Sequence, residues 1–386
     1  MLNYLEPKIS KIAIFIMRSV GPLYVKFIEK VSEIDLTKSE TLKKSLNDFK
    51  EGKIRLIVAF RHPTQHDPAV LMHVINNCIS KRNKHHAQFV YGSWVLTWAT
   101  PIVKWLFPRI GAIPVSSRGS DFRGIKEIRK SMLNSNFPIA IAPEAQVNYH
   151  NNRVGELEDG IINIASWCKD DLIKNNRTED VVILPVTTHY IYGNNQKKEL
   201  DKLFRILSRR LSFYPTETDV NKKLFIYTQK IMELVKNQYG IHNEDIIETV
   251  LKKAELPLRI SSSGSILNRV LTIRAKAEEN NSSDLLEILK DMEVADILEY
   301  IDYTYLEDNN INRQIEYLLN LYDLHNRLIN GGTIANRYNK TFKKVLIISD
   351  EPIIYKAIGT REEKRMQNID LKNELHNRFN KISNYY

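Results

Sequence analysis

Cysteine is scarce in this sequence: the 386 residues include two, Cys78 and Cys168. Each lies in an apolar segment, and neither belongs to a CxxC pair or to a cysteine–histidine pattern with metal-ligand spacing. A disulfide framework and a thiolate zinc site are therefore not expected, and a reducing compartment is favoured. The chain also lacks a glycine-rich phosphate loop and any recognisable nucleic-acid module, so we expect no nucleic-acid partner.

Long hydrophobic runs are missing as well. The apolar stretch 12–17 ends at Arg18 and is followed by Pro22, which makes it too short for a secretory core or a membrane span. The uncharged stretch 89–103 is interrupted by Pro101. The sequence therefore predicts a cytoplasmic protein.

Contact with a membrane surface remains compatible with this pattern. Residues 9–34 predict one or two amphipathic helices, with apolar residues on one side and Lys11, Arg18, Lys26 and Lys30 on the other. Such a helix either lies on a membrane or packs on its own domain. Lys and Arg outnumber Asp and Glu by 56 to 46, so the surface is expected to attract anions such as anionic lipid or phosphate-bearing molecules.

The arrangement of apolar blocks predicts an α/β fold. Between residues 51 and 195, short apolar blocks alternate with longer helical patterns, which indicates a mixed, mostly parallel sheet flanked by helices. Residues 1–50 are expected to form the N-terminal amphipathic helices, and residues 196–386 a helical C-terminal region. Functional side chains of open α/β sheets gather at the carboxyl ends of the strands.

One strand end carries two histidines, an aspartate and two prolines. The apolar block IRLIVAF is followed by RHPTQHDP, in which Pro63 ends the strand and Pro68 suits the first turn of a helix. This turn can bring the Asp67 carboxylate to the His62 imidazole, which is the arrangement of a general base and its orienting carboxylate. Two other readings stay open from these residues alone: Asp67 only caps the helix, or His62, His66 and Asp67 bind a metal ion.

The remaining strand ends favour the first reading. Four segments resemble, in the same order, the motifs of the glycerolipid acyltransferase family, whose best-known members acylate 1-acylglycerol-3-phosphate. They are HPTQHD with the H-x4-D spacing at His62 and Asp67, GAIPVSSR ending at Arg118, APEAQVN with Pro143 and Glu144, and VVILPVTT with Pro185. Four motifs in order are far more specific than one.

The resemblance implies direct acyl transfer without a covalent acyl-enzyme, a metal or a cofactor. His62 would be the general base, and Asp67 would orient it. The hydroxyl of a lysophospholipid or related glycerolipid would attack an acyl thioester of coenzyme A or acyl carrier protein. Glu144 would bind acceptor hydroxyls and Arg118 a phosphate, and we expect Gln146 to contact substrate as well.

The chain departs from the family at two motifs. The usual E-G-T-R reads Glu144, Ala145, Gln146, Val147, so the arginine that would bind phosphate is missing and Arg153 is a candidate replacement. Arg118 falls one position late in the second motif, which makes Arg123 a second candidate. Two alternative functions follow: a metal-dependent or thioester hydrolase that uses the same histidines, and a catalytically silent lipid-binding module.

Overall fold

The protein is described by a computed structural model that covers residues 4–80, 84–97, 99–116, 122–280, 285–329, 337–357 and 359–385. Within these ranges one sheet forms the centre of the fold, with strand order β1-β7-β6-β2-β5-β3-β4 and β8 paired to β6. The strands are β1 (Val31–Lys38), β2 (Ile54–Phe60), β3 (Gln88–Gly92), β4 (Ile113–Val115), β5 (Ile139–Ile141), β6 (Asp180–Tyr192), β7 (Lys343–Ser349) and β8 (Ile353–Tyr355).

Most neighbouring strands run parallel. Within the described ranges both antiparallel pairs involve β6, which pairs with β7 along the second half of its length and with β8 along the first, while its other edge pairs with β2. All the other pairs are parallel. The predicted mixed, mostly parallel sheet is therefore confirmed.

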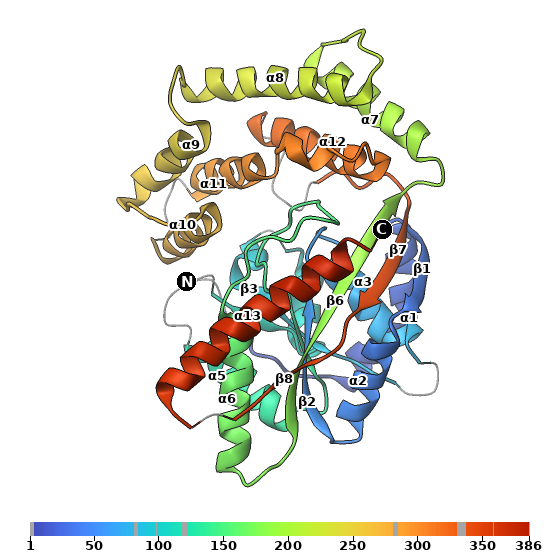
Figure 1. Ribbon diagram of the computed structural model, residues 1–386, viewed down its shortest axis with the longest axis vertical. Coiled ribbons are helices and arrows are strands. Elements are labelled where there is room, and N and C mark those ends of the chain that lie inside the picture. Colours follow the sequence, from blue (N-terminus) through green and yellow to red (C-terminus); the bar gives the residue numbers. More distant parts are fainter. Residues whose placement is uncertain are drawn as a thin grey trace.

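Helices cover both faces of the sheet and also form a separate layer (Figure 1). The helices around the sheet are α1 (Lys11–Phe27), α2 (Glu40–Lys50), α3 (Asp67–His73), α4 (Pro101–Arg109), α5 (Phe122–Asn134), α6 (Gly160–Lys174) and α13 (Arg361–Ser383). The helical layer consists of α7 (Gln196–Leu211), α8 (Val220–Tyr239), α9 (Ile246–Glu255), α10 (Ile266–Asn280), α11 (Leu285–Glu299) and α12 (Ile311–Leu328).

Strand β2 shows why the sheet is covered on both sides. Leu56, Val58 and Phe60 belong to the core shared with α2 and α3, whereas Ile57 and Ala59 belong to the core shared with α5, α6 and α13. Successive side chains of a strand point to opposite faces, so a continuous apolar run needs a layer of helices on each face.

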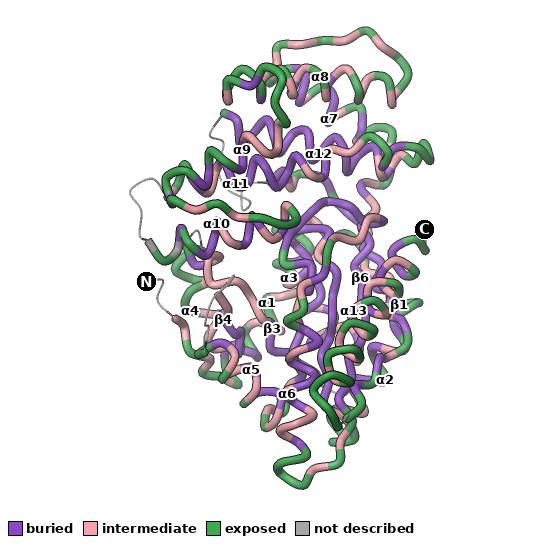
Figure 2. Tube along the Cα trace, turned by 60° about the vertical axis from the view of Figure 1, so that its left-hand side comes forward, coloured by how far each residue is buried: buried purple, intermediate pink, exposed green. Residues whose placement is uncertain are grey.

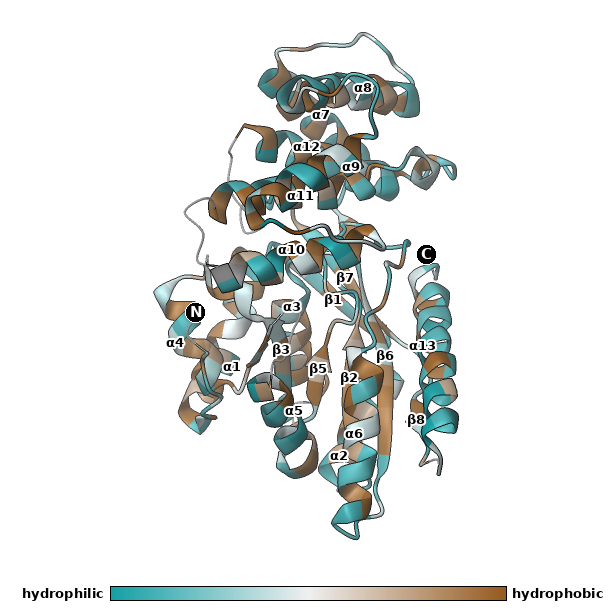
Figure 3. Cartoon of the chain, turned by 90° about the vertical axis from the view of Figure 1, so that its left-hand side faces the viewer, coloured by the Kyte–Doolittle hydropathy of each residue, from teal (hydrophilic) through white to brown (hydrophobic). Residues whose placement is uncertain are grey.

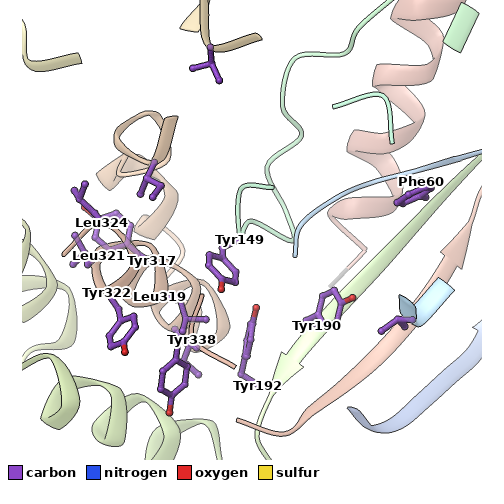
Figure 4. Close-up of a cluster of buried hydrophobic side chains, with 14 of the residues drawn as sticks. Phe60, Tyr149, Tyr190, Tyr192, Tyr317, Leu319, Leu321, Tyr322, Leu324 and Tyr338 are labelled. Atoms are coloured by element: carbon purple, nitrogen blue, oxygen red, sulfur yellow. The ribbon is translucent and has the colours of Figure 1, made fainter. Parts of the chain in front are cut away.

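The helical layer lies beyond the carboxyl ends of β2 and β6. Its central helix, α12, is buried along nearly its whole length (Figure 2), and Asn312 at its start accepts a hydrogen bond of 3.1 Å from the backbone of Tyr192 at the end of β6. Tyr149 and Tyr192 fill the space between the sheet and the leucines of α12 (Figure 4). The layer therefore shares one core with the sheet and covers the edge where functional residues were expected.

The sheet extends beyond residues 51–195, where it was expected. β1 lies between α1 and α2 in the segment expected to be helical, and it pairs with β7 from the C-terminal region. β7 and β8 then lead into α13, which returns to the sheet. The amino-acid pattern of β1 is only weakly apolar, as suits a strand that has one neighbour within the described ranges and is largely exposed.

Candidate functional site

The turn after β2 brings His62 and Asp67 together. β2 ends at Phe60, and Asp67 is the first residue of α3, with Pro68 in its first turn. His62 Nδ1 lies 3.0 Å from Asp67 Oδ2. Since a carboxylate can only accept, Nδ1 carries the proton of a neutral ring and the lone pair is on Nε2. His62 thus has the tautomer that a general base at Nε2 requires.

The Asp67 carboxylate is fully buried and held from several directions. Oδ2 also accepts from the backbone N–H of Thr64 at 2.7 Å, while Oδ1 accepts from the Tyr190 hydroxyl at 2.6 Å and from the Thr188 hydroxyl. A buried carboxylate with this many donors is fixed in position and satisfied in its ionised form. The simple helix-capping role does not account for the side-chain donors from β6.

Thr188 and Tyr190 were not anticipated from the sequence. They are two positions apart on β6 and therefore lie on the same face of the sheet. The alternation within VTTHYIY was a signal for two polar groups on one face. It did not reveal that this face lies next to Asp67, because that depends on how β6 is placed relative to α3.

His62 remains accessible on its other side. Its side chain is 19% exposed, and Nε2 makes no hydrogen bond within the described ranges. The ring lies edge-on to Phe60, with centroids 6.1 Å apart. The proton-accepting nitrogen thus belongs to a partly exposed ring and has no protein partner within the described ranges.

Glu144 adjoins His62, but through the backbone. Its Oε2 accepts the His62 N–H at 2.8 Å, and its Oε1 accepts from Arg61 at 3.0 Å and from the Gly155 N–H at 2.8 Å. Burial raises the pKa of Glu144, but the Arg61 charge and the two backbone N–H groups outweigh it, so the pKa lies below its ordinary value. With both oxygens bonded to protein donors, Glu144 fixes the turn that carries His62.

Arg61 is the centre of this buried network. Its guanidinium donates to the carbonyl groups of Asn151 and Arg153, each at 2.6 Å, and to the hydroxyl of Ser383 at 2.9 Å. The turn after β2, the loop after β5 and the end of α13 are thereby joined through one side chain. Sequence reasoning missed Arg61, because nothing local distinguishes it from a surface arginine.

The other candidate substrate-binding residues are spread over several places. Gln146 is buried, donates to Asp296 of α11 and accepts from Arg274 of α10 at 3.3 Å. Arg153 pairs with Asp302 at 2.7 Å, and Arg123 is exposed on α5. Arg118 lies outside the described residues. Of the seven residues singled out from the sequence, the structure brings His62, Asp67 and Glu144 together at one turn.

A second buried polar cluster lies behind Asp67. His66 Nδ1 bonds Glu29, which lies just after α1. The His66 ring is therefore paired with Glu29 and not with His62. Lys343 of β7 is also buried, and its ammonium group donates to Asn339 at 2.7 Å. Burial lowers the pKa of His66 below its ordinary value and that of Lys343 to about 7. These groups put titratable charge next to Asp67 without contacting the accessible side of His62.

The fold and the site together define a mixed α/β protein with a histidine–carboxylate pair at the carboxyl end of a central strand. No protein-family model matches the chain, and no curated protein matches it significantly. The likeness to the glycerolipid acyltransferases therefore depends on the four motifs in the sequence.

Proposed function

We propose that the protein is an O-acyltransferase that moves a fatty acyl group from an acyl thioester to the hydroxyl of a lysophospholipid or a related glycerolipid. The single observation that carries the proposal is the geometry of His62: Nδ1 bonds a buried carboxylate, the side chain is partly exposed, and Nε2 makes no hydrogen bond within the described ranges. The four motifs in family order support the same reaction.

In this reaction His62 Nε2 takes the proton of the acceptor hydroxyl as its oxygen attacks the thioester carbonyl. The tetrahedral intermediate then collapses, the carbon–sulfur bond breaks, and the thiolate leaves with the proton returned by the imidazolium. Asp67 stabilises the imidazolium in between. Glu144 acts as a positioning residue because it holds the His62 backbone.

The co-substrate is coenzyme A or acyl carrier protein loaded with an acyl chain, and we expect no further cofactor. Both donors are anionic, which suits a chain with a formal net charge of +10. Because the acceptor is a lipid, the proposal places the protein at the cytoplasmic face of a membrane as a peripheral protein. No helix in the described ranges is both long and apolar enough to cross a bilayer.

The test is an acceptor screen with a labelled acyl donor, in which the lipid product is identified by mass and free thiol is followed in parallel. We expect thiol release that depends on an acceptor, and loss of product in His62→Ala. His242→Ala, at an exposed position of the helical layer, is the matched control and should behave as wild type. Unchanged product formation in His62→Ala would rule out this base.

The same assay separates the alternatives. A thioester hydrolase would release thiol without an acceptor, and a metal-dependent one would also lose activity with a chelator. A silent lipid-binding module would bind vesicles and form no product with any acceptor. The buried donors around Asp67 favour the acyltransferase, because a silent module has no need of an ionised carboxylate behind an accessible imidazole.

A further inference from the structure

One side of α1 exposes a continuous apolar stripe. Ile12, Ile16, Val20, Leu23 and Phe27 recur every three or four residues, and all of them are exposed. Ile12 is 72% exposed, and Phe15 next to the stripe is 66% exposed. The inward side is formed by Ala13, Ile14 and Val25, which are buried. Large exposed apolar patches of this kind mark interaction surfaces.

Helix α4 continues this surface. Ile102 and Trp105 are exposed, with Ile102 at 74%. α4 contacts α1, and the segment before α1 is tied to the end of α4 by hydrogen bonds from Lys8 N to Pro108 O at 2.7 Å and from Ser10 N to Arg109 O at 2.8 Å. Figure 3 shows α4 beside α1 near the N-terminus. We call the exposed apolar residues of the two helices the α1–α4 face.

All the charge on these two helices has one sign. Neither α1 nor α4 contains an acidic residue, and their exposed charges are Lys11, Lys26 and Lys104. Arg109 is half-buried at the end of α4, and Arg18 donates to the His85 carbonyl of the protein instead of facing solvent. Apolar side chains among basic ones complement an anionic phospholipid surface, where the chains enter the acyl region and the cations meet the headgroups.

A cavity of about 500 Å³ opens at the edge of the same face. It is lined by Tyr4, Leu5, Glu6, Lys8, Ser10, Pro108 and Arg109. The Arg109 guanidinium stacks on Trp105 at 4.5 Å, so an aromatic ring and a cation lie together where a headgroup boundary would be. Lys8 and Arg109 outnumber Glu6, and the cavity suits the phosphate of a lipid headgroup.

We propose that the α1–α4 face docks on an anionic phospholipid bilayer, with a headgroup phosphate between Lys8 and Arg109. A second copy of the chain is a poorer occupant, because a symmetric interface would place basic residues opposite basic residues. The membrane partner of the proposed acyltransferase is thereby an anionic bilayer that binds at the α1–α4 face. The role of this lipid as a substrate rests on the proposed function.

Docking on this face would place the bilayer against the helix that packs on α3. α1 contacts α3, whose first residue is Asp67. Glu29, two residues after α1, bonds His66 in the turn between His62 and Asp67. The helix that meets the lipid is thus connected directly to the turn that carries the base.

The test is co-sedimentation of the full chain with vesicles of phosphatidylcholine alone or mixed in equal parts with phosphatidylglycerol. We expect the mixed vesicles to bind at least about tenfold more tightly, with the preference lost at high salt. Phe15→Asp combined with Leu23→Asp should weaken binding by at least about tenfold, and Lys8→Gln or Arg109→Gln by about fivefold each. The matched control, Tyr214→Asp with Leu256→Asp, places two acids at exposed apolar positions of the helical layer and should bind as wild type.

Two results would overturn the proposal: equal binding to both vesicles, or wild-type vesicle binding by the Phe15 and Leu23 double variant. In the second case, the solution mass of the variant is compared with that of the wild type, and the informative outcome is a fall from dimer to monomer. The last outcome would assign the face to a second copy. His62→Ala should bind vesicles as wild type, so failure of the acyltransferase proposal is measured separately from failure of docking.

Discussion

Asp67→Asn tests the pairing of His62 with its carboxylate while preserving shape. In the variant the amide oxygen can accept from Thr64 N–H and His62 Nδ1, as Oδ2 does now. The amide nitrogen would face the hydroxyls of Thr188 and Tyr190, which can rotate to accept. The fold should therefore persist, and the main loss is the negative charge.

The expected loss of rate follows from the distance. Asp67 Oδ2 lies 3.0 Å from His62 Nδ1. Taking about 4 Å between the centres of charge and an effective permittivity of about 20, the carboxylate stabilises the imidazolium by ~4 kcal/mol. Because 1.36 kcal/mol corresponds to a factor of ten, we expect the rate of acyl transfer to fall by about a thousandfold.

The assay is single-turnover formation of the labelled lipid product, with thermal unfolding measured on the same samples. Tyr190→Phe is the companion variant: it removes one hydrogen bond to Asp67 and keeps the charge, so the rate should fall by no more than about tenfold. A folded Asp67→Asn protein with a rate within about tenfold of wild type would show that the base does not depend on the carboxylate.

Two further predictions concern the groups around the site. Glu144→Gln should lower the free energy of unfolding by about 3 kcal/mol in urea titrations, because it leaves the buried Arg61 charge without its 3.0 Å carboxylate partner; a loss below about 1 kcal/mol would contradict this. Burial raises the pKa of Asp296 to about 7, so between pH 4 and 7 the folded protein keeps a proton that the unfolded chain releases, and stability falls as pH rises through that range. The free energy of unfolding should therefore fall by about 2 kcal/mol less between pH 5.5 and pH 8 in Asp296→Asn than in wild type. If the two proteins have the same pH profile, Asp296 does not keep its proton in the folded state.

The parts of the site that were predictable are local in sequence. His62 and Asp67 are five positions apart, and the prolines beside them restrict the backbone to a turn that enters a helix. The sheet was predictable for the same kind of reason, since short apolar blocks between helical patterns have few other arrangements.

The parts that were not predictable depend on pairing between distant segments. Glu144 was expected to meet the acceptor, and its bonds to Arg61 and to two backbone N–H groups could not be foreseen. Gln146 was expected at the substrate, and its bond to Asp296, which is 150 residues away, could not be foreseen. Composition and spacing describe a residue's neighbours along the chain, whereas its bonding depends on which other segments pack against it.

The amino-acid pattern specifies the type of fold, the turn that joins His62 to Asp67, and the amphipathic stripe of α1, because these follow from local sterics and from the period of apolar residues. Packing between distant segments determines that Thr188 and Tyr190 hold Asp67, that β1 and β7 complete the sheet, and that the helical layer covers the loop after β5. The physical reason is that burial and hydrogen bonding are set by contacts across the whole chain, and those contacts exist only once the sheet and the helical layer have packed together.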